Sequence, residues 1–491
     1  MQTFTPFKHQ LEAIEQLKIM ETIGFGGFLS DSPGMGKTAT MSMFLKKYKF
    51  DMPDLIICPK SVLYVWEREI TRVYECLEPK KDKPRILVNT GIKREINLAK
   101  KWDFVIVSYS TITTDLPHLI DKFWGRIVLD ESHIIRNGIK TKSGFAKSIF
   151  ELKDLSRYRY CLSATPYNNR ISDVASQAYF IGTSPYDEVS WWKKNKNNQE
   201  ILSIWKDKFV IKRTKEGLLK PPIYHTISVN PTNVEEKLIQ ALKQKTKKML
   251  DEWQVAKARK DNSERMRLQA CILALITQLR QISNSYFCIE DSYVPEVQEI
   301  TENCAKVSSI ITNIDKCLRT DKKRSVVVFS QFTSFLDIIE LMLEEELCGV
   351  DIYRIDGSKS SKHREEAIKG FNESKDSRVM LISLMAGGTG ISLHQNCSNV
   401  FICEPYFNPF VELQAEERVH RLGQTEQVNV YRFKMENSIE EWLEMLKAKK
   451  NESAHMLDMS KSGLPVSTGI TMEDLKELFR SKVYVSDKEL S

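Results

Sequence analysis

Short apolar runs alternate with longer amphipathic stretches along most of this chain. Each run is bounded by polar residues, which is typical of a strand that is buried on both faces of a sheet. Because strands that alternate with helices form parallel βαβ units, the pattern predicts an α/β protein. The loops after parallel strands gather at the carboxyl edge of the sheet, where ligands bind. The runs lie at residues 28–29, 55–60, 104–109, 126–130, 325–330, 353–358 and 379–384.

The pattern changes in the middle of the chain, where helical periodicity replaces the strands. An apolar stripe from Leu268 to Leu279 has helical spacing, and a second helical pattern covers residues 238–250. Between Lys243 and Arg267, nine Lys or Arg residues stand against four acidic ones, a net +5 of the chain's +7. Two interpretations stay open: a solvated helical protrusion, or a contact with the phosphate backbone of a duplex.

Three tryptophans lie among lysines and asparagines just before this region, at positions 191, 192 and 205. Aromatic side chains between basic residues can stack on nucleic-acid bases. Tryptophans also pack helices together, and the sequence alone leaves both interpretations open.

The composition narrows the class of protein. A chain of 491 residues with 42% apolar and 28% charged residues is predicted to fold into about three globular domains. The ten cysteines include no Cys-x-x-Cys pair, which favours reduced thiols in a cytosolic or nuclear compartment over a zinc module. The first ten residues contain no signal-peptide core, and no apolar run approaches about 20 residues. We therefore expect an intracellular protein with no membrane span.

Residues 27–38 combine a short strand, a glycine-containing loop and the start of a helix. This layout is typical of a phosphate-binding loop, in which main-chain N–H groups and a helix N-terminus face an anion. Lys37 would reach the β- and γ-phosphates, and the Thr38 hydroxyl would hold Mg²⁺. The usual first glycine of the pattern is Asp31 here. The nucleotide-binding residues predicted in this loop are Asp31, Gly34, Gly36, Lys37 and Thr38.

Two further sets of residues in the first half support a nucleotide site. Asp130 and Glu131 end an apolar strand, where Asp130 is placed to hold Mg²⁺ and Glu131 to orient or deprotonate the attacking water. Paired acids at a strand end can also be ordinary surface residues, and the nearby phosphate loop favours the catalytic interpretation. Gln10 precedes the loop, and its side-chain amide could donate to and accept from an adenine edge.

A pattern of arginines marks the second half. Gln414, Arg418 and Arg421 are spaced to share one face of a predicted helix. Guanidinium groups are forked and always charged, so they suit phosphate oxygens, and we predict that these residues complete the ATP site. The alternative is a surface helix with salt bridges.

These motifs, in their order and spacing, resemble those of a known family. Gln10, residues 31–38, Asp130 to His133 and Ser163 to Pro166 resemble the first lobe of superfamily-two helicase-like ATPases. The Asp in place of the first loop glycine is similar to Swi/Snf-type DNA translocases, and residues 414–424 resemble their second lobe. The second lobe resembles the DNA-damage-tolerance and transcription-termination branches. The lack of additional reader domains resembles stand-alone viral members such as the baculovirus global transactivator.

The resemblance implies two RecA-like P-loop lobes of parallel sheets flanked by helices, with a helical insertion and a C-terminal helical brace. The implied segments are residues 1–222 for lobe 1, 223–300 for the insertion, 301–446 for lobe 2 and 447–491 for the brace. The implied nucleic-acid contacts are polar residues that follow the strands, namely Lys60, Ser108, Ser330, Gln331, Thr389 and Gly390.

The implied function is a DNA-dependent ATPase with ATP and Mg²⁺ as cofactors. It would move on double-stranded DNA and displace or remodel nucleosomes or other bound proteins, as a nuclear monomer or in a host nucleus. Three alternatives remain: a strand-separating helicase, a non-catalytic transcription-regulatory adaptor, and a P-loop ATPase that acts on proteins or small molecules. The basic run at Lys322 to Arg324 is a nuclear signal or the cap of a strand.

Overall fold

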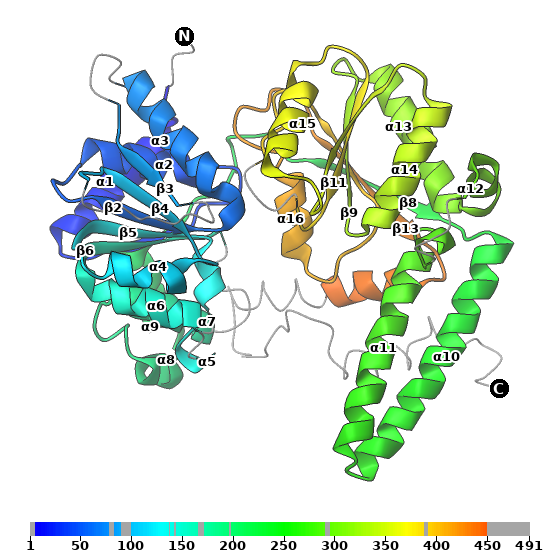
Figure 1. Ribbon diagram of the computed structural model, residues 1–491, viewed down its shortest axis with the longest axis horizontal. Helices are drawn as coiled ribbons and strands as arrows, with labels where there is room; N and C mark the ends of the chain where they lie inside the picture. Colours follow the sequence, from blue (N-terminus) through cyan, green and yellow to red (C-terminus); the bar gives the residue numbers. More distant parts are fainter. Residues whose placement is uncertain are drawn as a thin grey trace. The chain divides into compact units, whose positions relative to one another are not determined.

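The computed structural model describes residues 5–77, 83–89, 100–136, 138–141, 144–164, 171–195, 198–289, 295–386 and 391–448. These residues form two compact units, which meet in the sequence at Leu218 and Leu219. Each unit contains one parallel sheet flanked by helices (Figure 1). This confirms the predicted fold class of two α/β lobes. Within the described ranges, no helix has the length and apolar character needed to cross a membrane.

The first unit is built on a seven-stranded sheet in the order β3-β4-β2-β5-β6-β1-β7, in which every paired strand is parallel. Its strands are β1 (Gly27–Leu29), β2 (Asp54–Cys58), β3 (Ile86–Val88), β4 (Phe104–Ser108), β5 (Trp124–Asp130), β6 (Ser156–Leu162) and β7 (Val210–Ile211). Its helices are α1 (Lys8–Thr22), α2 (Lys37–Lys47), α3 (Leu63–Leu77), α4 (Ile112–Leu119), α5 (Gly138–Thr141), α6 (Gly144–Leu152), α7 (Ile171–Ile181), α8 (Val189–Asn195) and α9 (Gln199–Phe209).

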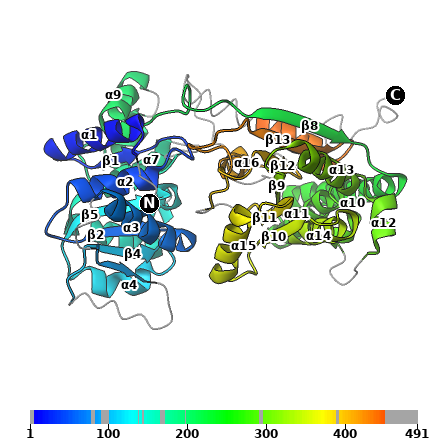
Figure 2. The ribbon, with the colours of Figure 1, turned by 90° about the horizontal axis from the view of Figure 1, so that it is seen from above.

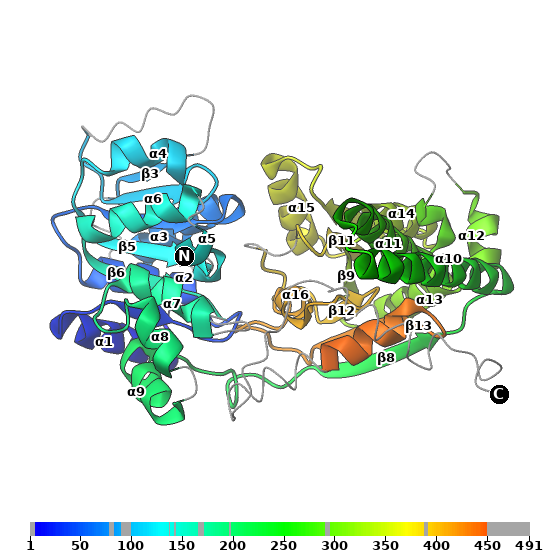
Figure 3. The same ribbon diagram turned by 90° about the horizontal axis from the view of Figure 1, so that it is seen from below.

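Both faces of this sheet are buried, which explains why its strands are apolar at consecutive positions. Helices α1, α2 and α3 pack on one face, and α4, α6, α7 and α9 pack on the other (Figure 3). Successive residues of β2 alternate between the two cores, with Ile56 in one and Ile57 in the other. Trp192 and Trp205 are 2% exposed inside the second core. These tryptophans therefore pack helices and do not form a stacking surface for bases.

The second unit contains a six-stranded parallel sheet in the order β10-β11-β9-β12-β13-β8. Its strands are β8 (Ile223–Val229), β9 (Ser325–Ser330), β10 (Asp351–Ile355), β11 (Arg378–Ser383), β12 (Asn399–Ile402) and β13 (Asn429–Met435). Its helices are α10 (Asn233–Ala258), α11 (Asn262–Ile282), α12 (Val297–Asn303), α13 (Ala305–Thr320), α14 (Thr333–Glu346), α15 (Ser361–Glu373) and α16 (Pro409–Glu416).

The region assigned to a helical insertion begins with a strand, which corrects part of the prediction. β8 pairs with β13 along seven residues and forms an edge of the second sheet (Figure 2). Most of its side chains are exposed, so it lacks the continuous apolar run by which the central strands are recognised. The two helices that follow are those predicted, and they form an antiparallel pair (Figure 3).

The pair α10–α11 is attached to its unit by a small core of its own. Leu250, Trp253 and Leu279 of the pair pack with Ile439 and Trp442, which lie in a helical stretch at residues 439–448. α10 begins with a capping box between Thr232 and Glu235. The C-terminal brace, assigned to residues 447–491, lies outside the described residues apart from its first two. Of these, Lys447 is buried and donates to Glu412 of the second unit (2.9 and 3.0 Å).

Candidate nucleotide-binding site

The loop between β1 and α2 is held close to the first helix. Gly34 and Gly36 have φ values of 76° and 79°, a conformation that glycine adopts without steric cost. A Cβ placed on Gly36 would lie 2.8 Å from Nε2 of Gln10. The ring of the neighbouring His9 also reaches the loop, with Nε2 3.1 Å from the carbonyl of Met35. Two adjacent residues of α1 therefore contact the loop, which leaves no space for side chains at Gly36.

Gln10, predicted to contact adenine, lies against the loop, and its two amide atoms have different surroundings. The side chain is 3% exposed, and Oε1 accepts a hydrogen bond from the main-chain N–H of Phe7 (3.0 Å). The acceptor of the amide is therefore used within α1, and Nε2 is the atom that lies beside Gly36.

Lys37 is the first residue of α2 and is half-buried. Its Nζ donates to the main-chain carbonyl of Asp31 across the loop (2.9 Å). The loop and the lysine that folds back over it together enclose a position for an anion, and this geometry fits a phosphate group. Thr38, the next residue, is also half-buried at the start of the helix.

The Asp31 side chain does not lie where a nucleotide ligand was predicted. It is 0% exposed, and its carboxylate accepts from Nε (2.9 Å), Nη2 and the main-chain N–H (3.1 Å) of Arg213. The carboxylate is thus saturated by the segment that follows β7. In this structure Asp31 contributes its main-chain carbonyl to the loop, through the contact with Lys37.

Asp130 ends β5 and is held from three directions. Oδ2 accepts from the indole Nε1 of Trp66 (2.8 Å), Oδ1 accepts from the main-chain N–H of Glu131 (3.0 Å), and the Asp130 carbonyl accepts from Tyr109 Oη (2.8 Å). Burial and the adjacent Glu131 raise the pKa of Asp130 to about 6, while Trp66 and the charge of Lys37 act in the opposite direction. The ends of β1 and β5 lie at one edge of the sheet, since Leu29 and Asp130 both pair with Leu162 of β6, so the loop and this carboxylate are neighbours there.

Glu131 has a main-chain conformation that L-residues adopt rarely, with φ of 51°. Its carboxylate is 32% exposed and lies 3.3 Å from Nδ1 of His133, which is also 3.2 Å from Oγ of Ser163. This carboxylate is partly open to solvent. It is therefore able to contact a water molecule, the role predicted for it.

The three residues predicted on one helical face in the second unit are not on one helix. α16 ends at Glu416, so Gln414 is helical whereas Arg418 and Arg421 lie in the turns that follow. The carbonyls that would continue the helix have other donors: that of Arg418 accepts from the N–H of Leu393 (3.0 Å), and that of Val419 from the side chain of Gln424 (3.2 Å). These contacts take the place of helical ones, and the first joins residues 25 positions apart, which sequence periodicity does not show.

A neutral histidine lies near the second of these arginines. Burial, followed by the charges of Arg421 and Lys323, lowers the pKa of His394 to about 4. Its Nδ1 lies 2.9 Å from Oγ of Ser392. The side chain therefore adds no positive charge beside Arg421 near neutral pH.

Two of the predicted nucleic-acid contacts are buried, which corrects those assignments. Ser108 is 1% exposed, and its Oγ lies 2.9 Å from that of Ser110. Ser330 is 0% exposed and donates to both carboxylate oxygens of Glu404 (3.1 and 3.0 Å). A hydroxyl that follows a strand can stabilise the loop as well as contact a ligand, and a sequence does not distinguish the two. Lys60 is exposed, and Thr389 and Gly390 lie outside the described residues.

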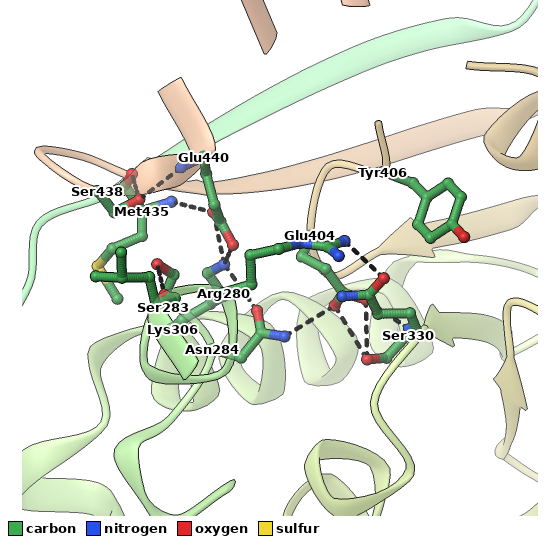
Figure 4. A network of polar contacts seen from close by, with 12 residues as sticks. Arg280, Ser283, Asn284, Lys306, Ser330, Glu404, Tyr406, Met435, Ser438 and Glu440 are labelled. Atoms are coloured by element: carbon green, nitrogen blue, oxygen red, sulfur yellow. Dashed lines mark hydrogen bonds and ion pairs between the residues drawn. The ribbon is translucent and has the colours of Figure 1, made fainter. Parts of the chain in front are cut away.

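Ser330 belongs to a buried polar network at the carboxyl edge of the second sheet (Figure 4). Glu404 also accepts from Nδ2 of Asn284 (3.1 Å), whose Oδ1 accepts from Lys306. Lys306 donates to both carboxylate oxygens of Glu440 (2.6 and 2.8 Å). Gln331, predicted to contact nucleic acid, accepts through Oε1 from Arg280 of α11 (2.6 Å). The network ties the base of the helical pair to the ends of β9 and β12.

Residues 9–287 match the SNF2-related domain, and residues 306–423 match the helicase conserved C-terminal domain. The chain belongs to the SNF2 family.

Among its SNF2 relatives is the DNA repair protein RAD5B of Arabidopsis thaliana. It is 26% identical, over 96% of this chain and 48% of the plant protein. The probable global transactivator of Orgyia pseudotsugata multicapsid polyhedrosis virus is also 26% identical, over 96% of this chain and 94% of the viral one. The solved SWI2/SNF2 ATPase core of Sulfolobus solfataricus in complex with dsDNA is 24% identical over 94% of this chain and 97% of its own, with a TM-score of 0.40. The chain thus spans about half of the plant relative and nearly all of the viral one.

Four residues around this candidate site were not predicted from the sequence as site residues. Trp66 and Tyr109 hold Asp130, while His9 and Arg213 hold the phosphate loop. His9 adjoins Gln10 and could have been found by that adjacency. The other three act through contacts between segments 21 to 182 residues apart, for which the motifs carry no signal.

Proposed function

We propose that this chain is an ATP- and Mg²⁺-dependent translocase on double-stranded DNA that displaces or remodels DNA-bound proteins. One observation carries the proposal. Lys37 begins the helix that follows the loop after β1, and Asp130 ends β5. Because Leu29 of β1 and Asp130 of β5 both pair with Leu162 of β6, the loop and the carboxylate lie at the same carboxyl edge of the first sheet. This is the arrangement that phosphate and a divalent cation require in P-loop enzymes.

The residues present fit a nucleotide with Mg²⁺. Asp130 and Thr38 would hold the cation, and the cradle formed by Gly34, Gly36 and Lys37 would hold the phosphates. Bound Mg²⁺ would supply charge neutralisation on the phosphate oxygens. Lys37 would exchange its bond to the Asp31 carbonyl for a phosphate oxygen, because the stronger acceptor is the charged one.

The roles in hydrolysis follow from the surroundings of each side chain. The hydrogen bond from Trp66 fixes the orientation of the Asp130 carboxylate and favours its ionised form. Glu131, beside His133, would orient the attacking water and take up its proton. We assign Arg418 and Arg421 of the second unit as the guanidinium groups that neutralise phosphate charge, and Gln414 as a further nucleotide contact.

The DNA contact is assigned to exposed cations. On α10 and α11, Lys243 is buried and donates to the carbonyl of Asn437 (2.8 Å), but the other basic residues of this stretch lie at or near the surface. Together with Lys60, they favour the duplex-backbone interpretation of the helical pair. Such contacts give sequence-independent binding that weakens with salt. We expect the protein to act as a monomer in the nucleus, or in a host nucleus if its source is viral, with nucleosomes among its targets.

Displacement of a third strand from a DNA triplex tests translocation without strand separation. The wild-type protein is expected to release the third strand in an ATP-dependent reaction while leaving forked and blunt duplexes paired. Lys37→Ala should abolish release and turnover, because it removes the loop's only lysine. ATP hydrolysis that persists in this variant would refute the site. Unwinding of the forked duplex would favour the helicase alternative instead.

A further inference from the structure

The phosphate loop runs beside the segment that leaves the first unit. The N–H of Ser30 donates to the carbonyl of Ile211 in β7 (2.7 Å), and the N–H of Ser32 donates to the carbonyl of Arg213 (3.0 Å). The first three residues of the loop therefore extend the pairing of β1 with β7 beyond the sheet. Any change in the conformation of this part of the loop acts directly on residues 211–213.

One guanidinium group connects the loop to both of its neighbours. The Arg213 side chain is 20% exposed and donates through Nε and Nη2 to the buried carboxylate of Asp31. Its Nη1 donates to the main-chain carbonyl of His9 in α1. Because a guanidinium is planar and rigid, this forked arrangement fixes the relative positions of the groups it joins.

Asp31 is the residue that stands where phosphate loops usually have their first glycine, and it contacts both sides of the loop. Its main-chain carbonyl accepts from Lys37, and its side chain accepts from Arg213. A glycine would provide the first of these contacts and not the second. Arg213 lies two residues beyond β7 and five before Leu218, where the first unit ends.

We propose that Asp31 and Arg213 are a positioning pair that couples occupancy of the phosphate loop to the connecting segment, residues 214–222. This inference rests on the proposed function, since Lys37 must leave the Asp31 carbonyl to reach a phosphate. The peptide group of Asp31 then loses a partner and changes its orientation. Its carboxylate moves with it and carries the guanidinium of Arg213, so the connecting segment changes its exposure to solvent.

Hydrogen exchange of residues 214–222 tests the coupling in the full chain, with and without a non-hydrolysable ATP analogue and Mg²⁺. In the wild type, the analogue is expected to change the exchange rate of this segment about fivefold or more, the usual lower range of allosteric coupling. Arg213→Lys keeps the charge but loses the fork, and Asp31→Asn keeps the shape but loses the charge. Both variants should lose the nucleotide-dependent change. Titration of each protein with a fluorescent ADP analogue sets the nucleotide concentration, so that exchange is compared at equal occupancy of the loop.

Arg85→Lys is the matched control. Arg85 makes the same kind of forked pair with Asp103 in the first unit (3.1 and 3.0 Å), but away from the loop. This variant should keep the wild-type response. The thermal unfolding midpoint of each variant shows whether it folds. If Asp31→Asn does not fold, Arg213→Lys alone tests the coupling.

The outcomes separate this inference from the proposed function. If the wild type hydrolyses ATP in a Lys37-dependent manner but residues 214–222 do not respond to the analogue, the coupling is refuted and the ATPase stands. If both variants respond like the wild type, the pair is only structural and the coupling is also refuted. If the wild type binds no nucleotide, both the inference and the proposed function fail.

Discussion

The two units use the carboxyl edges of their parallel sheets differently. In the first unit, the charged side chains at this edge are partly open: Glu131 is 32% exposed, and Lys37 and Asp130 are half-buried. In the second unit they are closed off, with Lys306 0% and Glu404 2% exposed. The same scaffold thus leaves ionisable groups partly accessible in one unit and pairs them internally in the other.

The two lysines show the difference most clearly. Lys37 donates to a neutral main-chain carbonyl, a partner it can exchange for a phosphate. Lys306 is bound by both oxygens of Glu440 and by Asn284, all of them buried. The two lysines therefore differ in their partners: a neutral carbonyl in the first unit, and a buried carboxylate and amide in the second.

Replacing the two lysines should give opposite results and is the largest expected effect. Lys306→Ala leaves the buried carboxylate of Glu440 without its ion pair, which should cost about 3–5 kcal/mol of unfolding free energy. Lys37→Ala should abolish turnover with little change in stability. Urea denaturation and ATPase assays on both variants check this. A stable Lys306→Ala protein would contradict the structural role of the second edge.

Trp66→Phe tests whether the first edge depends on a positioned carboxylate. The variant keeps an aromatic ring but loses the donor to Asp130, and turnover should fall by about 10-fold, as for other partners of metal-binding carboxylates. The control is Trp124→Phe in the same unit, whose indole donates to the carbonyl of Leu119 (3.2 Å) outside the site. Equal turnover in the two variants would show that the Trp66 bond does not matter.

Glu404→Gln tests the closed edge through its pH dependence. Burial raises the pKa of Glu404 from 4.5 to about 7. The folded protein therefore holds a proton between these pH values that the unfolded chain has released, so this group's contribution to stability falls as pH rises from about 4.5 to 7. The unfolding free energy of Glu404→Gln, measured relative to that of the wild type, should therefore increase by on the order of 1–3 kcal/mol when the pH is raised from 5 to 8.

Denaturation of both proteins at the two pH values measures this difference. Lys306, Glu440 and the donors Ser330 and Asn284 surround the carboxyl group and are present in both proteins. A stability difference that does not change with pH would mean that Glu404 is ionised throughout.

The smallest expected effect concerns the helical pair of the second unit. Arg259 and Lys260 are exposed where α10 meets α11. Replacing both with Gln should reduce the slope of the salt dependence of duplex binding by about 0.9 for each phosphate that the variant no longer neutralises. Lys83→Gln with Lys147→Gln, at 79% and 72% exposed positions of the first unit, is the matched control. An unchanged salt dependence would mean that the helical pair α10–α11 is a solvated protrusion and does not contact DNA.

The sequence predicted the elements whose signal is local. Apolar runs marked the central strands because these are buried on both faces, and the phosphate loop was evident from the glycines and the Gly-Lys-Thr at 36–38. The helix over Gln414, Arg418 and Arg421 was wrong because Leu393 and Gln424 take the carbonyls that would continue it.

The sequence motifs carried no signal for contacts between distant segments, so predictions that depended on such contacts could not be made correctly. Ser330 was assigned to nucleic acid because it follows a strand, but its partner Glu404 is 74 residues away. The role of Asp31 depends on Arg213, which lies 182 residues further along the chain. The edge strand β8 was hidden because most of its side chains are exposed and polar residues interrupt its apolar ones.

The rate of ATP hydrolysis with different nucleic acids tests the central claim most directly. It should be measured on the wild-type protein with no nucleic acid, with single-stranded DNA, with RNA and with blunt duplex DNA. We predict strong stimulation by the duplex alone. Equal or greater stimulation by single strands or RNA, or no stimulation by any of them, would contradict the account of a duplex-DNA translocase.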